Sequence, residues 1–432
     1  MENRFFNAHT HIFTLQQVPD QFAKGYFSIF AKTISISWLR KVGALAWLIK
    51  TIPKLYRNKD DVSMAERLIN LVKHGEERKD RPISQQAIFD TLRAYYPAKT
   101  AFIVLPMDME YMGAGSIPEG YMTQIEQLEK IKLQAVYTDT FFPFLFADPR
   151  RFVADPEYLS FVKTKLGSGI FSGLKMYPAL GYWPFDKNLK PLYDFCIQYN
   201  IPVMTHCAAG VVHSRSPRPK TFSTHPMNPD IRLQGKKPKH YTVHFSNPLS
   251  FHCLMDSKLL AAYWDVPEEE VSAYEKLKVC FSHFGGSSEW KRYLKIPWVP
   301  DRDDAESEGE FKSLQIKNWN YNLKPKDSDY SWFSIIREMM ERYENVYADI
   351  SFMLHDQETW PLLKVLLANK VLKFRTRVLF GTDFYVVAQM GSERELSLGL
   401  RAYLGEEFFM QIAKTNVENF LSTKIHEPTV ES

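Results

Sequence analysis

The chain has 432 residues, of which 45% are hydrophobic and 14% aromatic, enough apolar material for a large buried core. Its net charge of +4 is spread along the sequence, so we expect no nucleic-acid partner. No secretory signal opens the chain, and the most hydrophobic early stretch, residues 42–49, is too short to span a bilayer. These observations predict a cytoplasmic protein without a membrane span.

Cysteine usage supports the same location. The four cysteines form no Cys-x-x-Cys pair and lie mostly in apolar surroundings, so we interpret them as reduced, buried thiols and not as a disulfide framework. They are Cys196, Cys207, Cys253 and Cys280.

The first predicted strand contains two histidines in the sequence Asn7-Ala8-His9-Thr10-His11. Side chains alternate between the faces of a strand, so His9 and His11 point to the same side and can reach one common centre. Two such imidazoles suit an ion like Zn²⁺. Two ordinary histidines near a chain end would look the same, so the motif needs further ligands elsewhere.

Downstream, short apolar runs alternate with segments of helical periodicity. Runs of this length that end in polar or glycine residues are typical of buried parallel strands, and their alternation with helices favours a parallel sheet. With the first strand they make eight repeats, which predicts an α/β fold of the (β/α)8 TIM-barrel class. The apolar runs are 100–107, 140–147, 170–177, 201–206, 279–284, 346–352 and 378–383, and the helical segments 84–95, 121–133, 155–166, 189–199, 395–404 and 408–421.

Three segments interrupt this alternation, at about 14–84, 208–265 and 290–330. We interpret them as insertions, helical in the first case and loop-like in the others, in a single domain covering residues 1–432. The amphipathic stripes of the first insertion favour helices packed beside the core. A lid, a membrane-surface helix pair or the contact of a homodimer are the alternatives.

The polar residues that end the apolar runs are mostly of types that bind metal ions. In a (β/α)8 barrel the active site lies at the carboxyl ends of the strands. Selecting residues by that position alone yields almost exclusively metal-ligand types. They are His9, His11, Lys175, His206, His283 and Asp383.

With these motifs in place the chain resembles the amidohydrolase superfamily, and within it the amidohydrolase 2 branch, which includes hydrolases and aminocarboxymuconate-semialdehyde-type decarboxylases. The resemblance covers the barrel in order and leaves out the three insertions. The motifs that carry it are His9-Thr10-His11, Gly173–Pro178 (GLKMYP), Thr205-His206, Ser282–Gly286 (SHFGG) and Phe380–Phe384 (FGTDF).

The resemblance implies a role for each matching position. His9, His11, His206 and Asp383 would bind a divalent metal, for which zinc is expected, and Asp383 would also relay a proton. His283 would hydrogen-bond the reacting water or polarise the substrate oxygen. A satisfied core histidine is the alternative for His283.

Lys175 has two candidate roles. It could be carboxylated and bridge two metal ions, as in binuclear members of the superfamily, or its cation could bind a substrate carboxylate. We favour the second role, and therefore one ion, because amidohydrolase 2 proteins mostly resemble single-metal enzymes. A structural ion pair is the third option.

Other polar residues are weaker candidates. Tyr177 points the same way as Lys175 and could touch substrate, or pack at the rim. Cys207 faces away from His206, which favours packing, and Asp349 lies too deep in its strand for a ligand, which favours a structural group. The histidines of the second insertion match no metal motif, so we expect solvated loop residues. They are His213, His225, His240, His244 and His252.

The sequence therefore favours a metal-dependent hydrolase that uses metal-activated water on a small, carboxylate-bearing lactone, amide or ester-like substrate. A non-oxidative metal-dependent decarboxylase (a lyase) on the same scaffold is the alternative. Lys175 in the motif GLKMYP departs from the pattern expected of such decarboxylases, which favours the hydrolase. A metal-containing scaffold without turnover is less favoured, because no expected catalytic position is broken.

Overall fold

The structure is a computed structural model that describes residues 4–22, 84–208, 212–216, 223–233, 242–295, 331–384 and 392–424. Its contacts group into two compact units. The first comprises Met1–Phe146, Ser160–Lys175 and Leu379–Leu421, and the second Ala147–Leu159, Met176–Val378 and Ser422–Ser432. The single domain predicted for residues 1–432 stays a prediction. Most of the first and third predicted insertions lies outside the described residues.

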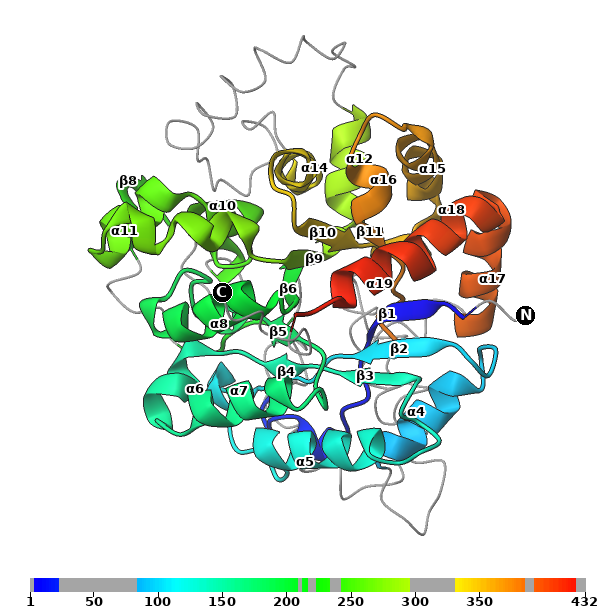
Figure 1. Ribbon diagram of the computed structural model, residues 1–432, viewed down its shortest axis with the longest axis horizontal. Helices are drawn as coiled ribbons and strands as arrows, with labels where there is room; N and C mark the ends of the chain where they lie inside the picture. Colours follow the sequence, from blue (N-terminus) through cyan, green and yellow to red (C-terminus); the bar gives the residue numbers. More distant parts are fainter. Residues whose placement is uncertain are drawn as a thin grey trace, which may run out of the picture. The chain divides into compact units, whose positions relative to one another are not determined.

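Parallel strands form the centre of the first unit (Figure 1). β1 (Phe6–Thr10) pairs with β2 (Ala101–Val104), and β2 with β3 (Phe141–Pro143). The chain continues through Phe144 into β4 (Leu145–Phe146), which pairs in parallel with β5 (Leu174–Met176). On the other side of β1 lies the segment after β11 (Val378–Leu379), where Thr10 forms a parallel bridge with Phe384. β1 is therefore flanked on both sides.

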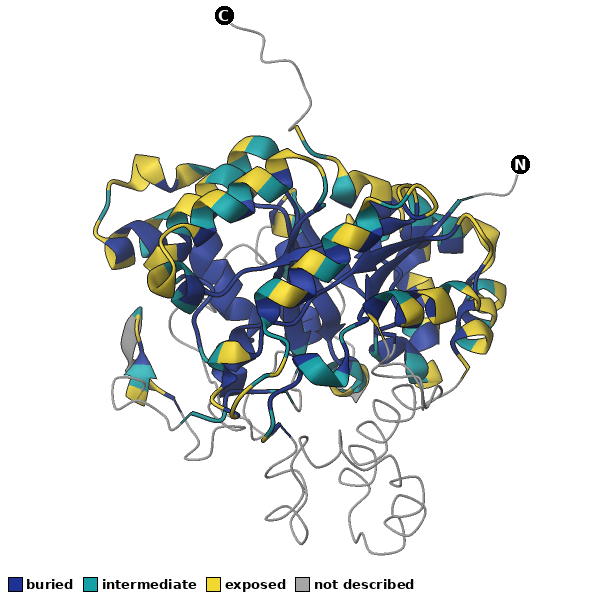
Figure 2. Cartoon of the chain, turned by 90° about the horizontal axis from the view of Figure 1, so that it is seen from below, coloured by how far each residue is buried: buried dark blue, intermediate teal, exposed yellow. Residues whose placement is uncertain are grey.

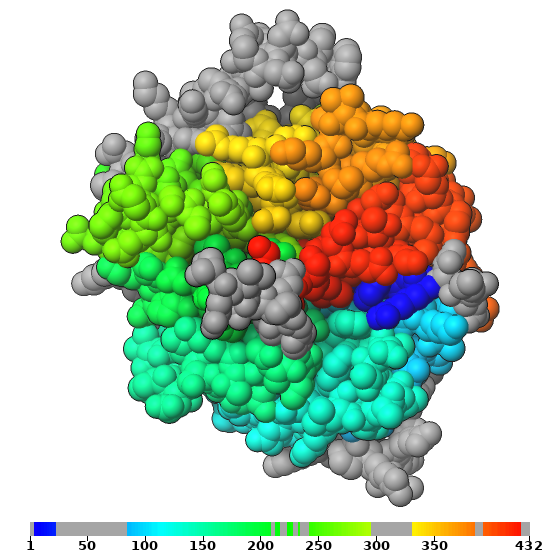
Figure 3. All heavy atoms as spheres, viewed as in Figure 1, coloured from blue at the N-terminus to red at the C-terminus, as the bar shows by residue number. Residues whose placement is uncertain are grey.

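Helices between and after these strands bury one face and expose the other (Figure 2). Side-chain caps mark the first turn of several of these helices. At the start of α4, for example, the side chain of Ser84 accepts a hydrogen bond from the backbone N–H of Ala87. The N-terminal strand lies beside the C-terminal helices (Figure 3), where the rings of Phe5 and Phe409 meet edge to face. The helices are α4 (Gln85–Arg93), α5 (Tyr121–Lys132), α7 (Tyr158–Gly167), α17 (Glu393–Leu404), α18 (Glu406–Met410), a π-helical turn (Gln411–Thr415) and α19 (Asn416–Leu421), with short 3-10 turns at Leu15–Gln17 and Glu110–Met112.

In the second unit, β9 (Val279–Gly285) pairs in parallel with β6 (Val203–Ala208) and with β10 (Val346–Asp349). Every described residue of β9 and β10 is buried, as their apolar sequences require. A small antiparallel pair, β7 (Thr224–His225) and β8 (Asn228–Arg232), belongs to the predicted second insertion. The helices are α6 (Pro149–Ala154), α8 (Lys190–Tyr199), α10 (Pro248–Met255), α11 (Ser257–Trp264), α12 (Ser287–Lys295), α14 (Trp332–Arg342), α15 (Trp360–Ala368) and α16 (Phe374–Arg377), with 3-10 turns at Pro178–Leu180, Lys187–Leu189, Thr242–His244, Glu268–Glu270, Ser272–Lys276, Met353–His355 and Gln357–Thr359.

Each apolar run of the sequence contains a strand in the structure, although most of these strands are shorter than predicted, β5 and β11 most of all. Counting β3 and β4 as one strand, the barrel strands follow the order β1, β2, β3/β4, β5, β6, β9, β10 and β11, with helices in the connections. The predicted α/β fold of the (β/α)8 TIM-barrel class is confirmed.

Candidate functional site

The two histidines of the first strand converge as their spacing predicts. The Nε2 atoms of His9 and His11 lie 3.2 Å apart, and both side chains are buried. The backbone carbonyl of Leu105, directly after β2, lies 2.8 Å from Nδ1 of His11. Because a carbonyl only accepts, Nδ1 of His11 carries the proton and donates it, which leaves Nε2 of the neutral ring with a lone pair. A metal-ligating histidine is usually oriented by such a second hydrogen bond.

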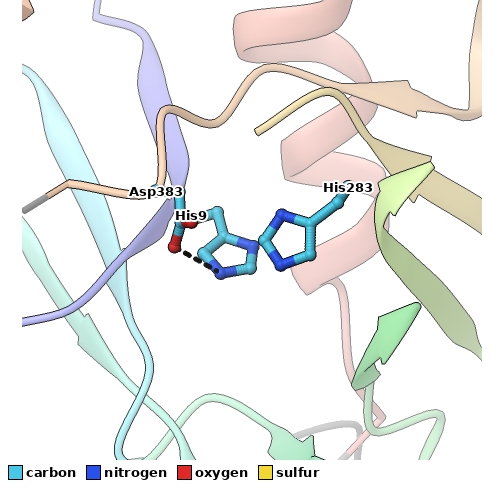
Figure 4. A group of neighbouring side chains, drawn as sticks. All are labelled: His9, His283 and Asp383. Carbon is cyan, nitrogen blue, oxygen red and sulfur yellow. Dashed lines mark ion pairs between the residues drawn. The ribbon is translucent and has the colours of Figure 1, made fainter. Parts of the chain in front are cut away.

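Asp383 joins this pair from the segment after β11, and Figure 4 shows its carboxylate beside the ring of His9. Its Oδ1 lies 3.5 Å from Nε2 of His9 and 3.4 Å from Nε2 of His11. The backbone fixes this approach, because the N–H of Asp383 donates to the carbonyl of His9 at 2.9 Å and the N–H of His11 to the carbonyl of Phe384 at 2.6 Å. The carboxylate is thus held beside both imidazoles by the strand pairing itself.

The three candidate ligand atoms have a spacing that fits a tetrahedral ion. Ligands at about 2.0–2.1 Å from a tetrahedral zinc lie about 3.3–3.4 Å from one another. The separations among Nε2 of His9, Nε2 of His11 and Oδ1 of Asp383 are 3.2, 3.4 and 3.5 Å. Two imidazole nitrogens and one carboxylate oxygen are also a donor set that divalent transition metals accept. This group is a possible metal site within the first unit.

In the second unit His206, at the end of β6, lies against His283. Nδ1 of His206 is 3.1 Å from Nε2 of His283, and its Nε2 is 3.1 Å from the carbonyl of Ala208. The ring of Tyr177 stacks on His206 with centroids 3.9 Å apart and planes 10° from parallel. Tyr177 therefore fixes the plane of the His206 ring, whether or not it also touches substrate.

His283 is held by the end of β10. Its backbone N–H donates to Oδ1 of Asp349 at 3.1 Å, and its Nδ1 lies 3.0 Å from Oγ and 3.3 Å from the carbonyl of Ser351. Ser351 also donates its backbone N–H to Oδ1 of Asp349 at 3.0 Å, and its hydroxyl bonds the same oxygen. Asp349 is thus a buried structural acceptor, as expected, and it orients the segment that positions His283.

Lys175 and Cys207 are both completely buried. Lys175 lies in β5 of the first unit, in register with Phe146 of β4. Burial raises the pKa of the Cys207 thiol, which agrees with the packing role expected for it.

The expectation of solvated histidines in the second insertion is wrong for the four that the structure describes, and His240 lies outside the described residues. All four are buried, because this part of the chain packs against residues outside the insertion: His225 contacts the ring of Trp183, and Nδ1 of His252 lies 2.8 Å from the hydroxyl of Tyr343. Burial lowers the pKa of His225 to about 3 and that of His252 to about 4. The four are His213, His225, His244 and His252.

Sequence reasoning missed the polar groups that support these candidates. Ser351 and Glu393 follow no motif, and nothing local marks them. Asn7 had a signal, because it precedes His9 by two residues on the same strand face. All three are buried and hydrogen-bonded.

Comparison with known proteins found no matching family model and no matching curated protein. Among solved structures, the chain is similar to 5-carboxyvanillate decarboxylase LigW from Sphingomonas paucimobilis, at 11% identity and a TM-score of 0.46, covering 97% of this chain and 98% of that one. It is similar to an uncharacterised TIM-barrel protein from Bordetella bronchiseptica, at 13% identity and a TM-score of 0.45, covering 97% of this chain and 98% of that one. It is also similar to amidohydrolase map2389c from Mycobacterium avium subsp. paratuberculosis, at 13% identity and a TM-score of 0.41, covering 98% of this chain and 100% of that one.

At these identities and TM-scores the similarity carries no argument about the reaction of this chain, which must come from its own residues. Among the described helices, none is long and apolar enough to cross a membrane.

Proposed function

We propose that the protein is a metal-dependent hydrolase that acts on a small, carboxylate-bearing substrate with a lactone, amide or ester-like bond. The observation that carries this proposal is the mutual spacing of 3.2, 3.4 and 3.5 Å among His9, His11 and Asp383, which fits a tetrahedral ion. A cation bound between these three buried groups would satisfy a lone pair of each of them at once.

His206 is the proposed fourth ligand. It ends a strand of the same (β/α)8 order, and in this fold class the strand ends supply the active site. One zinc ion is the expected cofactor. A second ion, bridged by a carboxylated Lys175, is the alternative.

A bound divalent ion supplies a nucleophile at neutral pH by lowering the pKa of water to about 7, and it polarises a carbonyl oxygen. Asp383 accepts the proton that the nucleophile releases, because a carboxylate keeps acceptor capacity when one oxygen is directed at the imidazoles. It then delivers this proton to the leaving group.

His283 polarises the substrate oxygen with a ring N–H. Asp349 and Ser351 hold the imidazole at the end of β9 through its backbone N–H and Nδ1, so Nε2, which lies 3.1 Å from Nδ1 of His206, is the nitrogen that would exchange this partner for the substrate oxygen. Lys175 is the proposed cation for the substrate carboxylate, and Tyr177, whose ring stacks on His206, is the weaker candidate for a contact with the substrate body.

The first experiment is elemental analysis of the purified protein. About one zinc ion per chain supports the proposal, two ions support the bridging role for Lys175, and the absence of any metal after zinc supplementation overturns the proposal. His9→Ala should lose the ion. His355→Ala, a histidine in a 3-10 turn outside the strand ends, should keep it.

The second experiment is a panel of lactones, esters, amides and aromatic or unsaturated carboxylic acids, with acid release and carbon dioxide both monitored. Acid release from the first three classes supports hydrolysis. Carbon dioxide release identifies the decarboxylase, since both reactions use the same ligand set. A metal-replete protein without turnover on the whole panel supports the scaffold. A cytoplasmic location and a homodimer stay predictions.

A further inference from the structure

A buried polar cluster in the first unit lies next to the candidate ligands without containing any of them. Its members come from β1, the turn after α4, the segment after β11 and the first residue of α17. They are Asn7, Tyr96, Thr382 and Glu393, and all four are buried.

Glu393 is the common acceptor of this cluster. Its Oε1 accepts the hydroxyl of Tyr96 at 2.5 Å and the hydroxyl of Thr382 at 2.6 Å, with the side-chain amide of Asn7 at 3.3 Å. The short distances are those expected for hydroxyls that donate to a charged or strongly polar acceptor. One carboxylate therefore fixes three segments of the chain together.

Asn7 connects the cluster to the ligand-bearing backbone. Its Nδ2 donates to Oγ1 of Thr382 at 2.8 Å and to the hydroxyl of Tyr96 at 3.1 Å. Its Oδ1 accepts the backbone N–H of Thr382 at 3.1 Å and lies 3.4 Å from that of His9. The cluster is thus bonded to His9 itself and to the residue directly before Asp383.

Burying the carboxyl group of Glu393 is costly, and three buried donors, from Tyr96, Thr382 and Asn7, offset that cost by bonding its Oε1. Burial raises the pKa of Glu393 to about 7, which shows the size of that cost, while its bonds to Thr382 and Tyr96 lower the pKa again in part. Retaining such a group points to a need for precise geometry.

We propose that Glu393 is a positioning residue for the metal centre, which through Thr382 and Asn7 sets the distance between Asp383 and His9. This inference rests on the proposed function. Groups in this position are not ligands, yet changing the partners of ligands commonly costs 10- to 100-fold in metal affinity or activity.

The test measures zinc affinity by competition with a chromophoric chelator, together with the midpoint of thermal unfolding. Glu393→Leu removes the acceptor and should weaken zinc binding about tenfold or more. Glu393→Gln keeps a carbonyl oxygen for the two hydroxyls and should restore most of that affinity. Tyr96→Phe removes one donor and should have an intermediate effect.

Tyr137→Phe is the matched control. The hydroxyl of Tyr137 bonds Oδ1 of Asp90 at 2.6 Å, so this variant also deletes one tyrosine–carboxylate bond in the same unit, but one that does not touch Thr382 or Asn7. It should lower the unfolding midpoint and leave zinc affinity unchanged.

The outcomes separate the two proposals. If the wild-type protein binds no zinc, the proposed function fails. If the wild type binds zinc and folded Glu393→Leu binds it within twofold, only the positioning role fails. Should Glu393→Leu not fold, the comparison of Tyr96→Phe with Tyr137→Phe decides, and equal zinc affinity in these two variants overturns the inference.

Discussion

The backbone N–H of Asp383 donates to the carbonyl of His9 at 2.9 Å, and this bond joins residues from the two ends of the sequence. Asp383 adopts a left-handed backbone conformation there, with a φ of 64°, and His283 adopts the same φ in the second unit. Non-glycine residues in this region are uncommon and are concentrated at functional sites. The two proposed catalytic residues therefore share a backbone conformation that the rest of the fold must enforce.

Asp383→Asn should fold normally and lose turnover. Asparagine tolerates the left-handed conformation and matches the carboxylate in size, but it cannot accept the proton. We expect a loss of at least about 100-fold in kcat, the usual size of a general acid–base contribution, with an unchanged circular dichroism spectrum. An active, metal-replete Asp383→Asn protein would show that the proton relay lies elsewhere.

Gly381→Ala should disturb the metal centre by direct overpacking. A Cβ at this position would lie 2.7 Å from Cβ and 3.0 Å from N of His9, and neither atom can move without moving β1. We expect a loss of about 1–3 kcal/mol in the free energy of unfolding, with weakened zinc binding. Gly167→Ala is the control, because a Cβ there meets nothing within 4 Å. Its free energy of unfolding should be unchanged or slightly higher than that of the wild type. Chemical denaturation of both variants checks the difference.

Glu393 should make the protein less stable as the pH rises. Its pKa is raised to about 7 in the folded state from 4.5, so the folded state binds this proton more tightly. The resulting stability is complete below pH 4.5 and is lost as the pH rises through 7. The difference of about 2.5 pKa units corresponds to about 3 kcal/mol at most.

Urea unfolding at pH 5 and pH 8 measures this effect, and Glu393→Gln should lose less stability between the two than the wild type does. Glu406→Gln is the comparison, since Arg401 lowers the pKa of Glu406 and this exposed group stays ionised over that range. Its pH dependence should match the wild type. If the stability of Glu393→Gln also showed the pH dependence of the wild type, this result would contradict the raised pKa of Glu393.

Ser351→Ala should slow turnover while metal content is retained. The hydroxyl of Ser351 lies between Nδ1 of His283 and Oδ1 of Asp349, and its removal frees the imidazole to rotate. Because the backbone bond from His283 to Asp349 survives, we expect a loss of about tenfold in kcat and little change in KM. Steady-state kinetics with zinc quantified in the same sample would test this, and an unchanged kcat would remove Ser351 from the site.

Zinc should raise the thermal stability of the wild type and not that of His11→Ala. A ligand that binds only the folded state adds about 2.7 kcal/mol at 100 times its Kd. Differential scanning fluorimetry with and without a chelator measures this effect, and Tyr137→Phe should respond to zinc as the wild type does. An equal rise for His11→Ala would place the ion away from β1.

The sequence located the strands and most candidate ligands because both depend on local patterns. Buried parallel strands are continuous apolar runs, and their ends are visible wherever polarity returns, as at His9 and His206. The alternation of strand faces likewise pairs His9 with His11 through their two-residue spacing alone. In the second insertion, local patterns predicted the wrong burial. His225 and His252 lie in a loop-like sequence but are buried by contacts with distant aromatic side chains.

The sequence by itself thus determined the α/β class, the order of the strands and the residue types at their ends, because each depends on neighbours along the chain. Only the tertiary structure decided that Asp383 lies beside His9, that Asp349 and Ser351 hold His283, and that Glu393 joins Asn7 to Thr382. Hydrogen bonds between remote segments leave no periodic trace in a sequence, since either partner alone resembles any other polar residue. Their geometry exists only once the strands are in register.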